Sequence, residues 1–236
     1  MLVVVASRHD EPAKALVTRW AAHDARLLTC EDLSVAGWRH YSDGRRPSRA
    51  VISGREVGVE EISGVLTRLP CVVEHELTHI IPVDRAYVAA EMTAFLTAWL
   101  TGLRCPVVNR PTPTCLSGPN WRPEQWVYAA AQVGIPVHPL HRRVSLGSQP
   151  GSAVSHSKPV TVTVLGDRWF GSVAPEVAIQ ARRLADAAKV ELLAVRFSGP
   201  DPGCSFVSAN IWPEFGSDDL LDALLAYLNE KRRTTY

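Results

Sequence analysis

The chain has 236 residues, of which 46% are hydrophobic and 21% are charged. This is the composition of a globular protein with enough apolar side chains for one large domain or two small ones. The net charge of +1 gives no reason to expect nucleic acid or an anionic membrane as a partner, and no apolar run is long enough to span a bilayer. The five cysteines are scattered without a CxxC pair, which argues against a zinc ribbon or a disulfide framework and indicates reduced thiols in a cytoplasm.

The first half of the chain predicts an α/β layer fold. Residues 64–111 are expected to form a strand, a long helix and a second strand, which is the order of a parallel crossover. Apolar residues recur along this helix at steps of three and four, and Asp84 stands at its start. The elements predicted here are a strand at 2–6, a helix at 11–23, a strand at 25–29, a hairpin at 49–53 and 55–59, a strand at 64–69, a helix at 84–103 and a strand at 106–109.

The second half begins with a helix from 122 to 133 that ends before a glycine. Residues 139–158 are rich in Ser, Gly, Pro, His and basic side chains, which predicts a flexible linker between a domain at 1–138 and a domain at 159–236. The last domain is expected to contain a hairpin at 160–165 and 168–172, a helix at 175–189, strands at 190–197 and 204–211, and a final helix at 218–230.

A zinc-hydrolase motif, HExxH, is present at residues 75–79. On an α-helix this spacing puts two imidazoles one turn apart, so that His75 and His79 bind Zn²⁺ while Glu76 acts as the general base. Glu91, on the next predicted helix, is a candidate third ligand. Over this short stretch the chain resembles the zincin metallopeptidases. The flanking prolines leave room for only a short helix, and so short a pattern also arises by chance, so histidines on a polar loop are the favoured alternative.

Several short motifs stand in a specific order along the chain: VLTR at 65–68, DRAY at 84–87, VNRP at 108–111 and VLGDRWF at 164–170. In this order they resemble the ATP-grasp proteins of the RimK and peptide-maturase (graspetide ligase) group. The resemblance implies a Rossmann-like pre-ATP-grasp domain followed by part of an ATP-grasp core. It also suggests an Arg and a Glu at the positions of Arg68 and Glu91, for which a structural ion pair is the leading interpretation, because buried charges persist only when paired.

The chain also departs from the pattern of this family. The stretch between the two matching pieces is too short for the central lid subdomain, so we expect a reduced, ATP-grasp-like α+β domain. Where the resemblance implies two acidic metal ligands, the chain has Arg196 and Ser208, and only Asn210 matches. Mg²⁺ requires hard anionic oxygen ligands, so this set cannot hold two Mg²⁺ ions as in the family. Arg196 is instead a candidate for binding a phosphate or carboxylate, with Ser208, Asn210 and Arg168 in the same cleft, or simply a salt-bridged arginine.

These observations predict a degenerate ATP-grasp protein that needs no cofactor and serves as a binding or accessory subunit in a peptide-modifying or small-molecule biosynthetic pathway. The expected partner is a protein or peptide, and the sheet face that a lid covers in the family is a candidate contact for a second copy of the chain. Three alternatives stay open. They are an ATP- and Mg²⁺-dependent carboxylate–amine ligase with unusual ligands, non-ATP chemistry in the same cleft, and a zinc hydrolase.

Overall fold

The computed structural model describes residues 1–41, 46–137 and 159–230. The chain divides into two compact units: the first comprises Met1–Asn120 and the segment that starts at Phe215, and the second lies within Trp121–Glu214. This division differs from the predicted domains at 1–138 and 159–236. The helix that follows Asn120 belongs to the second unit, and the last helix of the chain belongs to the first. The predicted linker at 139–158 lies outside the described residues.

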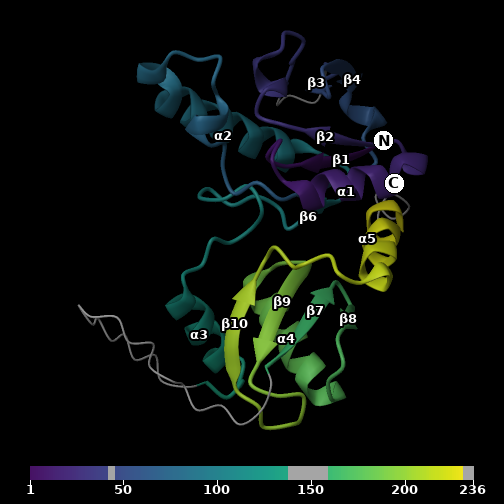
Figure 1. Cartoon of the computed structure of the whole chain (residues 1–236), viewed down its shortest axis with the longest axis vertical. Helices are drawn as coiled ribbons and strands as arrows, with labels where there is room; N and C mark the ends of the chain where they lie inside the picture. Colours follow the sequence, from purple (N-terminus) through teal and green to yellow (C-terminus); the bar gives the residue numbers. More distant parts are fainter. Residues whose placement is uncertain (42–45, 138–158, 231–236) are drawn as a thin grey trace. The chain divides into compact units, whose positions relative to one another are not determined.

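The first unit is built on a parallel four-stranded sheet with the strand order β2-β1-β5-β6 (Figure 1). Its strands are β1 (Leu2–Val5), β2 (Ala25–Leu28), β5 (Gly64–Thr67) and β6 (Val107–Val108). Helix α2 (Arg85–Gly102) joins β5 to β6, and these two strands are parallel, so the predicted crossover is confirmed. All residues of β1 and β5 are buried, as expected of parallel strands that are covered on both faces.

One face of this sheet packs against α2 and a separate hairpin, β3 (Arg49–Ile52) and β4 (Arg55–Gly58). The hairpin turns at Ser53 and Gly54, whose φ angles are 51° and 71°. Two consecutive residues with positive φ are the signature of a type I′ turn, so the predicted hairpin is confirmed. The buried cluster on this face includes Val3, Val5, Val65, Ile52, Leu96, Trp99 and Leu100.

Two helices from the opposite ends of the chain, α1 (Glu11–Arg19) and α5 (Asp218–Glu230), lie beside each other. Arg19 of α1 forms ion pairs with Asp218 and Asp222 of α5. These pairs are partly exposed and contribute little stability. Helix α5 also packs tightly against β5: a Cβ atom added to Gly64 would lie only 3.1 Å from Cβ of Leu228. This packing is the reason that the last helix belongs to the first unit.

The second unit contains an antiparallel sheet with the strand order β10-β9-β7-β8 (Figure 1). Its strands are β7 (Val160–Leu165), β8 (Arg168–Phe170), β9 (Leu192–Phe197) and β10 (Phe206–Asn210). Helix α4 (Pro175–Ala188) packs on β7 and β9, and α3 (Pro123–Gln132) packs on β10 and α4. The strands and helices predicted for 160–211 are therefore confirmed to within two residues at either end.

The first unit also contains short 3₁₀ helices, at Ala21–His23, Asp32–Ser34, Val59–Glu61, Glu74–Glu76 and Pro82–Asp84. Over the described residues of both units, the structure contains no helix that is both long and apolar enough to cross a membrane.

Candidate functional site

The sequence-predicted cleft residues of the second unit lie on one face of its antiparallel sheet. Arg196 of β9 is paired with Thr161 of β7 on one side and with Ser208 of β10 on the other. Residues that stand opposite each other in antiparallel strands project from the same face. Thr161, Arg196 and Ser208 therefore form a row across three strands. All three are exposed.

A second row lies two residues along the strands, where Ala194 stands between Thr163 and Asn210. The side chain of Asn210 is held by its neighbours: its Nδ2 donates to the carbonyl oxygen of Trp212, and its Oδ1 accepts from the Trp212 backbone N–H, both at 2.9 Å. The amide of Asn210 is therefore fixed in a local turn at the end of β10.

Arg168, the fourth predicted cleft residue, lies on the same face at the other edge of the sheet. It is paired with Leu165, and two residues further Phe170 is paired with Thr163. The guanidinium carbon of Arg168 lies 5.3 Å from the centre of the Phe170 ring, within the range of a cation–π contact. Arg168 is thus positioned by the β7–β8 hairpin and by this ring.

The opposite face of the sheet is apolar and buried. Val162, Val195 and Phe197, which alternate with the polar rows, are no more than 1% exposed. Helix α4 packs against β7 and β9 and contributes the buried Ala181 and Leu184. Because one face carries the core, the alternation of β7, β9 and β10 turns Thr161, Arg196 and Ser208 away from α4.

The electrostatic character of the polar face is cationic. None of the strands β7, β8, β9 and β10 contains Asp or Glu. Among the described residues, the Arg196 guanidinium has no ion-pair or hydrogen-bond partner. The alternative interpretation, that Arg196 is simply a salt-bridged arginine, is therefore not supported by the described part of the chain. An exposed guanidinium between two hydroxyl groups is a set of hydrogen-bond donors suited to an oxyanion.

The same donor set does not fit a magnesium–nucleotide complex. Mg²⁺ is held by carboxylates and other hard oxygen ligands in nearly octahedral geometry, and here the central position is a fixed positive charge. A hydroxyl group and an amide that is already engaged by Trp212 complete the set. A divalent cation at Arg196 would be repelled rather than coordinated.

Arg68 and Glu91 do not form the predicted ion pair. Arg68 follows β5 and pairs with Asp10, with 2.8 Å between its Nε and the carboxylate Oδ2. Both side chains are largely buried, and the Arg68 guanidinium also lies 4.8 Å from the centre of the Phe215 ring. Glu91 is exposed on α2. The predicted partner of Arg68 was wrong. Strands β1 and β5 are parallel neighbours in the sheet, so Asp10 and Arg68, which follow their carboxyl ends, lie close together.

The HExxH residues are not presented by an α-helix. Glu74–Glu76 forms one 3₁₀ turn that ends at Leu77, so the two imidazoles are not stacked one α-helical turn apart. His75 is exposed, and Nε2 of His79 lies 2.7 Å from Oγ of Ser34. In the described part of the chain, no three His, Cys, Asp or Glu side chains are arranged to hold a metal ion. The geometry that the zinc hypothesis requires is thus not formed.

Glu76 is nevertheless unusual, because it is only 3% exposed and its Oε2 atom is buried without a hydrogen-bond partner. The buried thiol of Cys30 lies near enough to interact with it electrostatically. Burial, reinforced by the Glu76 charge, raises the pKa of Cys30 to about 11. A thiol with this pKa is protonated at neutral pH and is a poor nucleophile.

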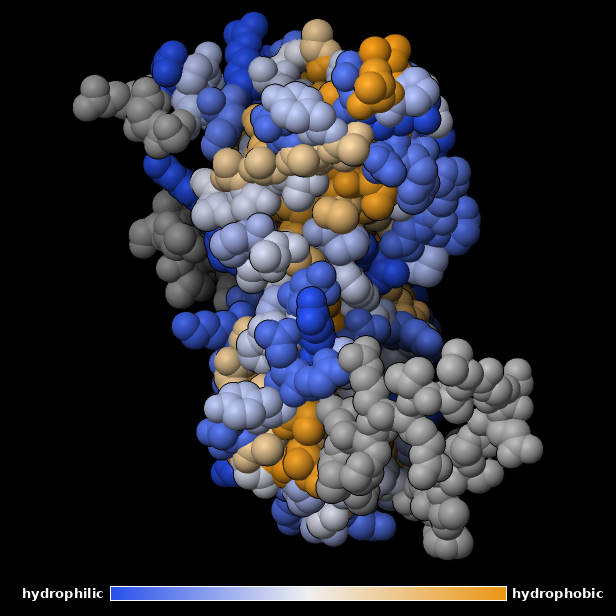
Figure 2. Space-filling view, turned by 90° about the vertical axis from the view of Figure 1, so that its left-hand side faces the viewer, coloured by the Kyte–Doolittle hydropathy of each residue, from blue (hydrophilic) through white to orange (hydrophobic). Residues whose placement is uncertain are grey.

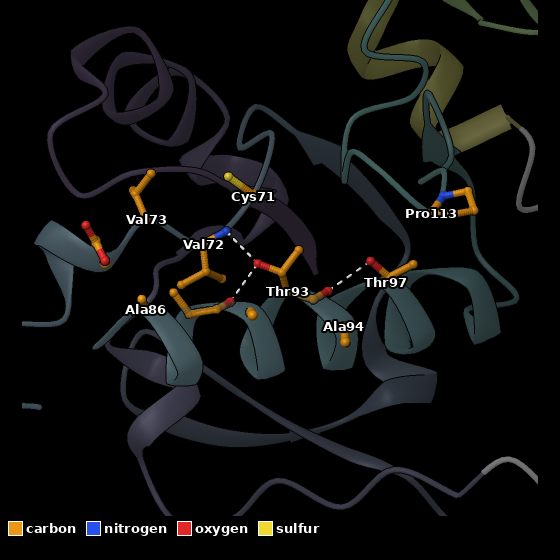
Figure 3. Close-up of a pocket in the computed structure, with 11 residues that line it drawn as sticks. Cys71, Val72, Val73, Ala86, Thr93, Ala94, Thr97 and Pro113 are labelled. Atoms are coloured by element: carbon orange, nitrogen blue, oxygen red, sulfur yellow. Dashed lines mark hydrogen bonds between the residues drawn. The ribbon is translucent and has the colours of Figure 1, made fainter. Parts of the chain in front are cut away.

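The first unit also has an open groove of about 550 Å³ along α2. Figure 3 shows small side chains of the helix, among them Ala86 and Ala94, on one side and Val73 on the other. Thr93 connects the two walls, because its Oγ1 accepts from the Val72 backbone N–H at 3.0 Å and donates to the Ala89 carbonyl at 2.8 Å. Figure 2 shows hydrophobic side chains among hydrophilic ones on the surface of this unit.

Thr161 is the member of the polar face that the sequence did not predict. The alternation of Thr and Val in β7 predicts a half-buried strand, but it does not identify the strand that lies beside it. Strand β7 pairs with β9 as well as with β8, the next strand in the sequence. The pairing with β9 brings Thr161 next to Arg196.

No protein-family model matches the sequence, and no curated protein sequence matches it. Solved structures do match the fold. The macrocyclase MdnC bound with the precursor peptide MdnA, from Microcystis aeruginosa MRC, is 11% identical, with a TM-score of 0.67 over 98% of this chain and 100% of that chain. The ATP-grasp ligase PsnB complexed with a minimal precursor, Mg and ADP is 12% identical, with a TM-score of 0.64 over 98% of each chain.

A third similar structure is the Chryseobacterium gregarium RiPP-associated ATP-grasp ligase in complex with ADP and a leader and core peptide. It is 11% identical, with a TM-score of 0.59 over 99% of this chain and 93% of that chain. The chain therefore has the fold of the ATP-grasp ligases, and the predicted resemblance is confirmed at the level of the fold. The predicted absence of the lid subdomain stays a prediction.

Proposed function

We propose that this chain is a peptide-binding subunit with an ATP-grasp fold, acting in a peptide-modifying pathway without ATP-dependent carboxylate activation of its own. The observation that carries this proposal is the polar sheet face, where Arg196 and Ser208 stand at the positions at which the family resemblance implies acidic metal ligands. The four strands of this sheet contain no carboxylate side chain to replace them.

The absence of carboxylates weighs against the ligase alternative for an electrostatic reason. Phosphoryl transfer is catalysed mainly by positioning and by neutralising the charge of the phosphates with bound metal ions. A cationic sheet face without metal ligands keeps the ability to bind anions but loses the means to hold the metal. The peptide part of the proposal rests on the fold that the chain shares with enzymes crystallised with precursor peptides.

Thermal unfolding of the EDTA-treated protein, with and without millimolar Mg-ATP, tests this proposal. A ligand that binds only the folded state stabilises it by about 2.7 kcal/mol at a hundred times its dissociation constant. For a chain of this size such a gain raises Tm by about 5–10 °C. We expect no rise above that given by MgCl₂ alone.

A matched variant tests the electrostatic reason directly. Arg196→Asp combined with Ser208→Glu introduces carboxylates at the two positions, and we expect the Tm of this variant, unlike that of the wild type, to rise with MgCl₂. A clear rise in the wild-type chain, followed by release of ADP when peptide is added, would establish the ligase alternative instead.

A further inference from the structure

The polar sheet face carries two separate cationic positions. Arg196 lies in the middle of the face and Arg168 at the edge formed by β8. Both side chains are exposed. Between the two arginines, the strands carry Ala194, Phe170 and Thr163 on this face. The first two are partly buried, Thr163 is buried, and none of the three is charged. An uncharged strip of the face thus separates the two positive charges.

The strand register gives the separation of the two charges. Arg196 is opposite Thr161, and Arg168 is opposite Leu165, so the two arginines are offset by four residues along β7. They also lie on opposite sides of β7, two strand spacings apart. With about 3.3 Å per residue and about 4.8 Å per strand, the Cα atoms are about 16 Å apart. An extended peptide spans this distance in about five residues.

We propose that this face binds an acidic peptide segment in extended conformation, with one carboxylate at Arg196 and a second, about five residues away, at Arg168. Thr161 and Ser208 donate hydrogen bonds to the carboxylate that Arg196 binds. This inference rests on the proposed peptide-binding function and names the chemistry of the peptide at that site.

Charge complementarity and spacing favour a peptide over other anions. A single phosphate or pyrophosphate is too short to engage both arginines. A nucleic acid strand carries one charge per about 3.4 Å and is normally bound by a dense basic surface, whereas here two cations lie about 16 Å apart in a chain of net charge +1. A flexible acidic peptide matches two isolated cations and the uncharged strip between them.

Fluorescence anisotropy with defined peptides tests this inference. The probe is a labelled peptide of about twelve residues, built of Gly, Thr and Ala, with two glutamates about five positions apart. A second peptide has glutamine at both positions, and a third has the two glutamates adjacent. We expect the first peptide to bind most tightly, and we expect its binding to weaken as salt screens the charges.

Variants assign the binding to the sheet face. Arg196→Gln and Arg168→Gln should each weaken binding of the first peptide by about threefold, and the double variant by about tenfold. Arg183→Gln is the matched control, because it removes the same charge from the exposed side of α4 and should leave binding unchanged. All three substitutions are at exposed positions, and unchanged Tm values verify that the variants fold.

The possible outcomes separate this inference from the function on which it rests. Equal binding of the glutamate and glutamine peptides, or an unaffected double variant, overturns the acidic-segment inference and leaves peptide binding in place. Tighter binding of pyrophosphate or of a single-stranded oligonucleotide also overturns it. Failure of the wild-type chain to bind any of the peptides counts against the peptide-binding function itself, whatever the result with Mg-ATP.

Discussion

Replacement of Asp10 tests whether the ion pair with Arg68 stabilises the first unit. Asp10 has two roles, because its Oδ1 accepts from the Ala13 backbone N–H at the start of α1 and its Oδ2 accepts from Arg68 Nε. The two side chains are 15% and 13% exposed, so the pair is mostly shielded from solvent. Loss of one partner of a buried pair costs about 3–5 kcal/mol, and loss of an N-cap about 1 kcal/mol.

The residual exposure of the pair puts the expected cost at the lower end of this range. We expect Asp10→Ala to lower the free energy of unfolding of the first unit by about 4 kcal/mol. Asp10→Asn keeps a good N-cap and removes only the charge, so it should cost about 1 kcal/mol less than Asp10→Ala. Urea unfolding followed by tryptophan fluorescence measures both values.

The double variant Asp10→Asn with Arg68→Met completes the cycle. If the ion pair is responsible, the double variant is more stable than the sum of the single changes predicts, by about 1–3 kcal/mol. Additive effects, or an Asp10→Asn variant as stable as the wild type, would refute this reasoning and show that Arg68 is stabilised chiefly by Phe215.

Three further predictions follow from contacts in the first unit. Gly64→Val should destabilise the protein by about 1–3 kcal/mol in urea unfolding, because the added atoms collide with Leu228. Thr93→Val should cost about 1–3 kcal/mol in the same assay, because the backbone N–H of Val72 loses its acceptor. Cys30 should resist alkylation by iodoacetamide at pH 8, because its raised pKa of about 11 keeps the thiol protonated, and its labelling rate should increase as the pH approaches that value.

Each of these predictions has a control in the same chain. Gly216→Ala adds a Cβ atom where no heavy atom lies within 4 Å, and it should be neutral. Thr97→Val removes only a donor to the Thr93 carbonyl, so it should cost much less than Thr93→Val. Cys71 is partly exposed and should be alkylated faster than Cys30. A Cys30 thiol that reacts as fast in the folded as in the unfolded protein would contradict its burial.

Local patterns in the sequence were sufficient to predict most elements of the fold. The apolar runs at β1 and β5 predicted strands, and the long helix between β5 and β6 predicted the parallel crossover that the structure contains. Local patterns did not identify the polar face: only the family resemblance placed Arg196, Ser208 and Asn210 in one cleft, and these residues lie on the adjacent strands β9 and β10.

Long-range packing could not be predicted in the same way. Nothing in the sequence near Arg68 indicates that its partner is Asp10 rather than Glu91, since that depends on the neighbours of β5 in the sheet. The HExxH spacing was likewise ambiguous, because Leu77 is completely buried in the core and the chain makes a single 3₁₀ turn there. A pattern of five residues does not specify which of its side chains are buried in the core.

The return of α5 to the first unit has a consequence for biosynthesis. The helix that packs against β5 is translated only after every strand of the second unit, so the surface around Gly64 stays uncovered while the ribosome makes the rest of the chain. Contacts between residues so distant in sequence form late, because closing a long loop costs conformational entropy before any contact rewards it. The nascent first unit therefore exposes apolar surface of the kind that favours aggregation until α5 has been made, and a ribosome stalled before α5 would hold it incomplete.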